Sequence, residues 1–179
     1  PSMPNSIENA NVAIFSCPIE IQEIENSHQI QISNYQEYER FIQEERKYLH
    51  HITQKILNLG VDVVVCQKGV DDTVVAELAN RGVLVLRRCR KSDIEQLAKE
   101  LHSTIISELD TINAKDISQA KHVNVNTINK EEVISFAIEN SSFLSLIVCA
   151  TTQHIVDEID RAIEDAIGDI CNVLESSTI

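Results

Sequence analysis

The chain has 179 residues and is 43% hydrophobic, which is enough for one domain with a genuine core and room for an appendage. Its formal net charge of −13 disfavours general nucleic-acid binding, because such binding relies on Lys and Arg side chains that neutralise phosphates. No apolar run approaches the roughly 20 residues of a membrane span, and no signal-like segment opens the chain, so no membrane partner is expected.

The N-terminal part is predicted to form two short strands and one long helix. Residues 11–16 have the pattern of a strand, and residues 29–33 alternate as an exposed strand does. A helical pattern follows over residues 34–59, and Gly60 is placed to end it. Such a helix is roughly 35–40 Å long, which is too long to lie wholly on so small a domain.

The apolar residues of this helix fall into two groups separated by a polar turn. One stripe can dock on a core: Tyr48, Leu49, Ile52, Ile56, Leu57 and Leu59. A second cluster lies nearer the helix start: Tyr35, Tyr38, Phe41 and Ile42. Residues 43–47 are polar on every face, so we expect the N-terminal part of the helix to project into solvent. The second cluster is then a contact surface for a partner, or it packs on the 29–33 strand, and both can hold.

A strand–helix–strand unit is predicted next. Residues 61–66 and 83–86 are nearly continuous apolar runs, as is typical of parallel strands that are covered on both faces. Asp71 and Asp72 place carboxylates at the N-terminus of the intervening helix, residues 72–81, where they cap the helix and complement its dipole.

The middle of the chain gives one further clear helix and then a weak pattern. Ser92 and Glu95 have the spacing of a capping box, which predicts a helix that runs to about Leu101. Over residues 103–127 we expect turns, with a short helix near residues 114–119.

The C-terminal part is predicted to form a β-hairpin and an amphipathic helix. The hairpin joins residues 133–138 to residues 143–150 through a polar turn. The helix covers about residues 153–174. Its apolar face is formed by Ile155, Ile159, Ala162, Ile163, Ala166 and Ile170.

Several separated segments resemble a known family when they are taken together. They are residues 3–21 (MPNSIENANVAIFSCPIEI), 29–45 (QIQISNYQEYERFIQEE), 66–72 (CQKGVDD), 81–99 (RGVLVLRRCRKSDIEQLAK) and 151–167 (TTQHIVDEIDRAIEDAI). In this order and at nearly this spacing they are similar to the apical domain of the group II chaperonins, the archaeal thermosome and its eukaryotic cytosolic relatives. The resemblance covers most of the chain.

The resemblance implies an α/β fold: a chaperonin apical-type (swivelling β/β/α) domain with a long protruding helix and a C-terminal return helix. Residues 1–150 are then the apical substrate-binding domain, with the helical protrusion or lid at about residues 24–48. Residues 151–179 are then the return helix of the intermediate domain. The implied function is the substrate-binding and built-in-lid portion of an ATP-dependent chaperonin that binds and encloses non-native polypeptides. The implied partners are unfolded clients and neighbouring subunits of a double ring.

The resemblance also implies a substrate-binding surface. It carries the cluster Tyr35, Tyr38, Phe41 and Ile42 onto the protrusion. It carries the family's substrate-facing helix onto residues 72–81, with Asp72, Val75, Ala76, Ala79 and Asn80 as binding residues. The C-terminal half of the long helix is its expected neighbour, and the loop over residues 17–25 also faces the cavity.

One residue matches a catalytic position of the full-length family. Asp165 corresponds to the intermediate-domain aspartate that helps to position the water attacking ATP. Nothing in this chain resembles the family's phosphate-binding loops, so we expect no enzymatic activity and no cofactor here, with ATP and Mg bound by the full-length protein. Cys149, Ala150 and Thr151 stand where the family usually has Arg-Gly-Gly, which removes glycines suited to a hinge.

Other sites have simpler structural interpretations. The basic run over residues 87–91 is interpreted as a solvated turn. His50 and His51 point about 100° apart on a helix and lack a third ligand, so no metal is expected. The odd number of cysteines, five without C-x-x-C spacing, favours free thiols in a reducing, cytoplasmic compartment.

Two functions from other classes remain open. One is a free-standing α/β small-molecule-binding enzyme with a cradle over residues 68–72, at the carboxyl ends of the parallel strands. The other is a coiled-coil-type interaction domain. Its seam would be Tyr38, Ile42, Leu49, Ile52, Ile56 and Leu59.

Overall fold

The computed structural model describes residues 3–20 and 35–176, although the side chains of residues 35–39, 41 and 45 are outside that description. The predicted strand at residues 29–33 therefore lies outside the described residues. The chain divides into two compact units, Pro1–Ser142 and Phe143–Ile179.

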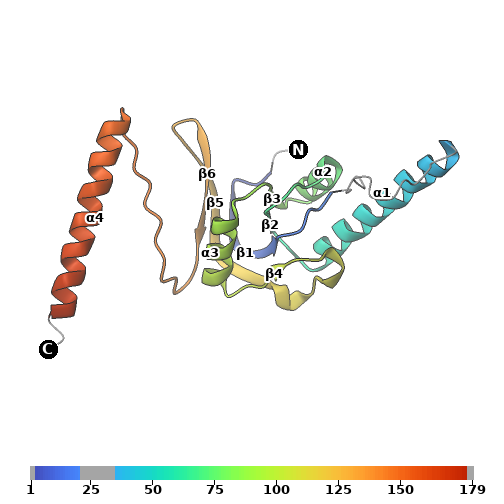
Figure 1. Ribbon diagram of the computed structural model, residues 1–179. Helices are drawn as coiled ribbons and strands as arrows, with labels where there is room; N and C mark the ends of the chain where they lie inside the picture. Colours follow the sequence, from blue (N-terminus) through green and yellow to red (C-terminus); the bar gives the residue numbers. More distant parts are fainter. Residues whose placement is uncertain (1–2, 21–34, 177–179) are drawn as a thin grey trace, which may run out of the picture. The chain divides into compact units, whose positions relative to one another are not determined.

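The first unit is built on a mixed six-stranded sheet with the order β3-β2-β1-β5-β6, and β4 pairs with β1 outside this path (Figure 1). The strands are β1 (Ser6–Phe15), β2 (Val63–Cys66), β3 (Leu84–Leu86), β4 (Ile105–Ile106), β5 (Ile117–Ile128) and β6 (Glu131–Ala137). β1, β2, β3 and β4 pair in parallel, whereas β5 and β6 pair antiparallel. The predicted parallel strand–helix–strand unit is confirmed.

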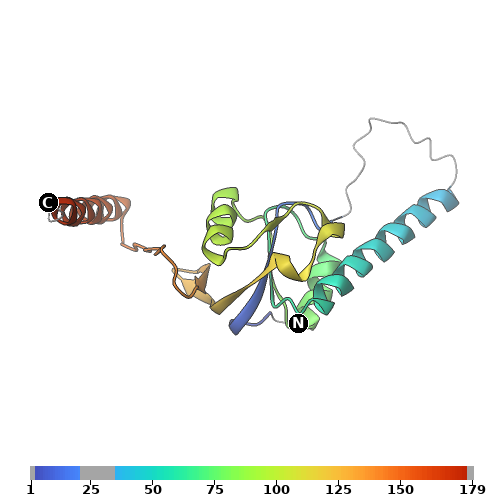
Figure 2. The ribbon, with the colours of Figure 1, turned by 90° about the horizontal axis from the view of Figure 1, so that it is seen from below.

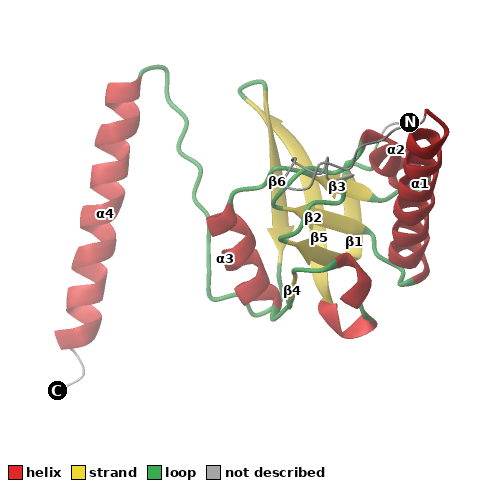
Figure 3. Cartoon of the chain, turned by 45° about the vertical axis from the view of Figure 1, so that its right-hand side comes forward, coloured by secondary structure: helices red, strands yellow, loops and turns green. Residues whose placement is uncertain are grey.

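Helices cover both faces of this sheet, and Figure 3 shows α1 and α2 on one side and α3 on the other. The α-helices are α1 (Tyr35–Asn58), α2 (Asp72–Asn80), α3 (Lys91–Leu101) and α4 (Gln153–Ser176). Two short 3-10 turns, η1 (Leu109–Thr111) and η2 (Ala114–Asp116), lead into β5.

The alternation of side chains along the central strands explains the two helical layers. Phe15 of β1 and Val64 of β2 pack in the cluster that contains the residues of α1 and α2. Ile14 and Val65, one position along each strand, pack in the cluster that contains residues of α3. Successive side chains of a strand point to opposite faces, so continuous apolar strands require a helix on each side.

The C-terminal half of α1 docks on the sheet as predicted. Leu49, Ile52 and Ile56 are buried in the cluster beneath it. Tyr48 is an exception to the predicted stripe, because its side chain is 43% exposed and its hydroxyl donates to Asp110 at 3.3 Å. The N-terminal half of α1 extends beyond the sheet (Figures 1 and 2), which agrees with the polar turn in the middle of the helix.

Most of the predicted helix ends are confirmed, and one is wrong. The Asp71 side chain accepts from the Thr73 amide at 2.8 Å and caps α2. Gly60 has φ +69°, which suits the left-handed turn after a helix. The predicted capping box of α3 is wrong, since the N-cap is Arg90 and Ser92 lies inside the helix, where its hydroxyl donates to Asp93.

The region after α3 differs most from the sequence-based expectation. The short helix expected near residues 114–119 is present as the 3-10 helix η2, which ends at Asp116. The turns expected from there to residue 127 are wrong, because β5 begins at Ile117. The predicted hairpin is wrong too, because β6 pairs with β5 through a turn at Asn129 and Lys130. Both turn residues have positive φ, +50° and +71°, as the two-residue turn that matches strand twist requires. Residues 143–150 form no strand.

The second unit consists of an irregular stretch followed by α4. The helix predicted at the C-terminus is therefore confirmed. Taken by itself, α4 has no buried residue. Its exposed apolar side chains include Ile155, Ile159, Ile167, Ile170, Val173 and Leu174. Among the described residues, no helix is both long and apolar enough to cross a membrane.

A single carboxylate holds the end of the first unit. Glu100 of α3 accepts from the Ser141 hydroxyl at 2.6 Å, the Ser142 amide at 3.1 Å and the Ser142 hydroxyl at 3.4 Å. The hydrogen bond from Ser141 is the main reason that the pKa of the Glu100 carboxyl lies below its ordinary value. The chain is therefore tied to α3 immediately before the second unit begins.

We predict that Glu100→Ala frees this segment. The amide of Ser142 should exchange with solvent faster, measured by hydrogen exchange, while Glu95→Ala on the same helix should leave it unchanged. Because the folded-state pKa of Glu100 is depressed, the contribution is present at neutral pH and is lost as the pH falls through that lowered pKa. Unchanged exchange in Glu100→Ala would show that the contact does not hold the segment.

Candidate functional site

The two helices on one face of the sheet are joined by a carboxylate. Glu77 of α2 receives a hydrogen bond from Gln54 Nε2 to its Oε1 at 2.8 Å. Its other oxygen, Oε2, lies 3.2 Å from His50 Nδ1. His50 and Gln54 are one turn apart on α1, so both oxygens of Glu77 are engaged by the same side of that helix. This contact joins α1 and α2 outside the core.

The outer side of α2 carries most of the binding residues predicted on that helix. Ala76 and Asn80 are exposed, and Val75 is partly buried against the core. The Asp72 carboxylate is exposed and pairs with Arg87 at 2.6 Å. Ala79 is 7% exposed, so its side chain belongs to the core and we leave it out of the surface.

The predicted cluster near the start of α1 is described only in part. The backbone of Tyr35, Tyr38 and Phe41 belongs to α1, but their side chains lie outside the described residues. Ile42 is partly exposed. Its place on the helix follows from spacing, since Ile42 precedes Arg46 and His50 by four and eight residues.

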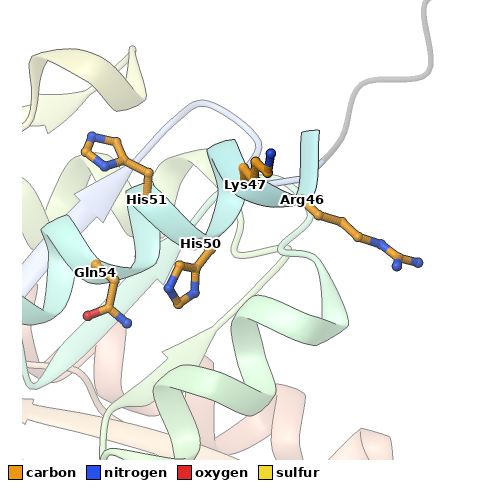
Figure 4. Close-up of a pocket in the computed structure, with 5 residues that line it drawn as sticks. All are labelled: Arg46, Lys47, His50, His51 and Gln54. Atoms are coloured by element: carbon orange, nitrogen blue, oxygen red, sulfur yellow. The ribbon is translucent and has the colours of Figure 1, made fainter. Parts of the chain in front are cut away.

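A shallow depression lies on α1 (Figure 4). It has a volume of about 420 Å³ and is lined by Arg46, Lys47, His50, His51 and Gln54. Figure 4 shows His50 and Gln54 projecting together from one side of the helix. The five side chains carry hydrogen-bond donors or cationic groups, while most of the surface that lines the depression is apolar.

The loop after β1 reaches the start of α2. Ile19 pairs with Val70, and its amide donates to the Gly69 carbonyl at 2.9 Å. The Asp71 amide donates back to the Ile19 carbonyl at 2.8 Å. Of the predicted loop at residues 17–25, the described part up to residue 20 is thus anchored beside the first turn of α2.

The cradle expected of a small-molecule enzyme is occupied by structural contacts. Asp71 caps α2, and Asp72 pairs with Arg87, as described above. Burial raises the pKa of the nearby Cys66 thiol to about 11, so this thiol is protonated and a poor nucleophile at neutral pH. Within the described parts of the chain, no group of three or more His, Cys, Asp and Glu residues is arranged to hold a metal ion.

The structure argues against the predicted coiled-coil seam. The coiled-coil seam uses Leu49, Ile52 and Ile56, which are buried inside the first unit and cannot face a partner helix. Asp165 lies exposed on α4, and its role stays a prediction. The bridge from Glu77 to α1 was not predicted from the sequence, because only the fold brings the two helices together.

The chain is similar to known proteins over its whole length. A sequence profile of the TCP-1/cpn60 chaperonin family matches residues 1–179. The chain is 35% identical to a thermosome subunit of Methanopyrus kandleri over 180 aligned positions, which cover 100% of this chain and 33% of that protein. It is 34% identical to the thermosome subunit beta of Methanothermobacter thermautotrophicus, with 100% and 34% covered.

A solved structure shows the same fold. It is the open-state monomer of a group II chaperonin from Methanococcoides burtonii, with a TM-score of 0.73 and 28% identity. The match covers 94% of this chain and 36% of that one. The chain thus spans about a third of the length of these similar proteins, and its α/β architecture with a C-terminal helix is that of the corresponding part.

We predict that Gln54 and Glu77 are energetically coupled. In a double-mutant cycle with Gln54→Ala and Glu77→Ala, the coupling free energy should be about 0.5–1 kcal/mol, as for a partly exposed hydrogen bond to a charged group. Chemical denaturation of the four proteins measures it. The pair Gln96→Ala and Glu77→Ala is the control, and Gln54 and Glu77 effects that simply add would contradict the bridge.

Proposed function

Because the chain belongs to the TCP-1/cpn60 chaperonin family, and within it to the group II chaperonins, we propose that it is the portion of a chaperonin subunit that binds non-native polypeptides. The observation that carries the proposal is the paired surface of α1 and α2. It combines a helix that extends beyond the sheet with the exposed outer side of α2. Non-native chains expose apolar segments, which such a surface can bind.

In this proposal residues 1–150 act as an apical substrate-binding domain. The stretch at about residues 24–48 is the built-in lid that encloses the client, and residues 151–179 return to an intermediate domain. The binding residues are Tyr35, Tyr38, Phe41 and Ile42 on α1, with Asp72, Val75, Ala76 and Asn80 on α2. Neighbouring subunits in a double ring are the proposed assembly, and the cytoplasm is the proposed location.

The energy source is proposed to lie in other parts of the subunit. ATP and Mg would be bound by the full-length protein, and Asp165 would help to position the attacking water only in that context. A carboxylate without a bound nucleotide cannot by itself hydrolyse ATP, so the proposed role of this chain is to bind non-native polypeptides.

Capture of a client should depend on the apolar cluster of α1. Tyr38→Ser/Phe41→Ser is expected to weaken suppression of aggregation of a denatured test protein by about tenfold or more, since a buried aromatic side chain contributes about 1.5–3 kcal/mol. Light scattering at increasing concentrations of the chain measures this. Gln43→Ser/Glu44→Ser, on the same helix, should suppress aggregation as the wild type does. Equal suppression by all three proteins would sink the assignment of this cluster.

The chain alone should not hydrolyse ATP. Phosphate release in the presence of Mg and ATP should stay at the level of the buffer, for the wild type and for Asp165→Ala alike. Metal- and ATP-dependent release that is lost in Asp165→Ala would refute this part of the proposal.

A further inference from the structure

The donor groups on α1 form two adjacent rows along the helix. Arg46, His50 and Gln54 follow one another at intervals of four residues, and Lys47 and His51 form the neighbouring row. Residues four apart lie on the same face of a helix, so these side chains make one continuous stripe. We refer to Arg46, Lys47, His50, His51 and Gln54 as the donor stripe.

One carboxylate of the fold already contacts the donor stripe. Its lower end holds the carboxylate of Glu77 with the His50 ring at 3.2 Å and the Gln54 amide at 2.8 Å. Among the described residues, Arg46, Lys47 and His51 make no ion pair and no side-chain hydrogen bond. The upper end of the stripe thus offers two permanent cations beside the depression, with no carboxylate engaged there.

An apolar side chain lies directly before the stripe. Ile42 precedes Arg46 by one helical turn and is partly exposed. A segment that lies along α1 therefore meets Ile42 first and cationic groups within the next turn. On the neighbouring helix, Ala76 and Asn80 expose a small and a neutral side chain.

We propose that the donor stripe selects clients in which Asp or Glu residues stand close to an apolar run. This inference rests on the proposed function and names the class of polypeptide that the surface prefers. Carboxylates of the client pair with Arg46 and Lys47, while its apolar residues contact Ile42. The guanidinium of Arg46 can hold a carboxylate through two parallel hydrogen bonds, which adds orientation to attraction.

The surrounding charges fit a short acidic segment rather than a nucleic acid. Glu44 is exposed on α1 three residues before Lys47, which is the spacing of helix neighbours, but among the described residues no ion pair joins the two side chains. The whole chain carries a formal charge of −13, so a long polyanion is repelled beyond the stripe. Nucleic-acid binding needs many phosphate contacts, whereas the stripe supplies two permanent cations over two helical turns.

The test measures peptide binding by fluorescence anisotropy. Three labelled peptides share one apolar core and carry flanking Glu, Gln or Lys residues. The proteins are the wild type, Arg46→Gln/Lys47→Gln, and Lys99→Gln/Lys130→Gln, which removes the same charge from exposed positions on α3 and the β5–β6 turn. Each pair is measured at low salt and again at about 1 M salt, which screens exposed charges.

The wild type should bind the Glu-flanked peptide about three- to tenfold more tightly than the Gln-flanked peptide at low salt. The preference should vanish in Arg46→Gln/Lys47→Gln and at high salt, but persist in Lys99→Gln/Lys130→Gln. Binding of the Gln-flanked peptide should be alike in all three proteins, which reports the apolar contact alone.

Four results would overturn the inference. Equal binding of the Glu- and Gln-flanked peptides by the wild type would leave the proposed function standing and remove the preference. An equal loss of the preference for the Glu-flanked peptide in both variants would show that net charge, and not the donor stripe, causes it. A uridine oligonucleotide that displaces the Glu-flanked peptide at lower concentration would make the stripe a phosphate site. Failure of every peptide to bind would instead overturn the proposed function, and the inference with it.

Discussion

The burial of β1 and β2 on both faces is the constraint on which the rest of the first unit depends. Strands with apolar side chains on each side need a helical layer on each side, and the C-terminal half of α1 supplies one of them through Leu49, Ile52 and Ile56. This docking fixes the direction of α1. Because the helix is straight and continues past the sheet, its N-terminal half is carried outward by the same packing.

The same docking makes the candidate surface. Once α1 lies on the sheet beside α2, the side chains of His50 and Gln54 meet Glu77, and the exposed sides of both helices become one surface. The core holds the geometry, whereas most of the residues proposed to contact a partner lie outside the core. The chain can therefore have a well-buried core and still expose a long surface of polar and apolar side chains.

The elements with strong local signals were predicted from the sequence. Asp71 and Gly60 mark helix ends through their own chemistry, and the apolar runs of β2 and β3 require two covered faces. β5 and its hairpin were missed because the turn uses Asn129 and Lys130 at positive φ where a glycine is the usual signal. Ser92 has the right spacing for a cap, yet the helix begins before it.

Part of the candidate site was predicted from the sequence, and part of it was not. The family resemblance pointed to α2 and the start of α1, but could not tell that Ala79 is turned into the core. The bridge from Glu77 joins residues that are 23 and 27 positions apart in the chain, so no local pattern contains it. Pairings of this kind follow from the packing of two helices on a shared sheet.

Site-specific photo-crosslinking to a denatured client protein tests the central claim most directly. A photoreactive amino acid is placed in turn at His50, Ala76, Lys121 and Thr127, all of which are exposed. The account predicts crosslinks from His50 on α1 and Ala76 on α2, and few from Lys121 and Thr127 on β5. Equal crosslinking from all four positions would contradict a binding surface formed by α1 and α2.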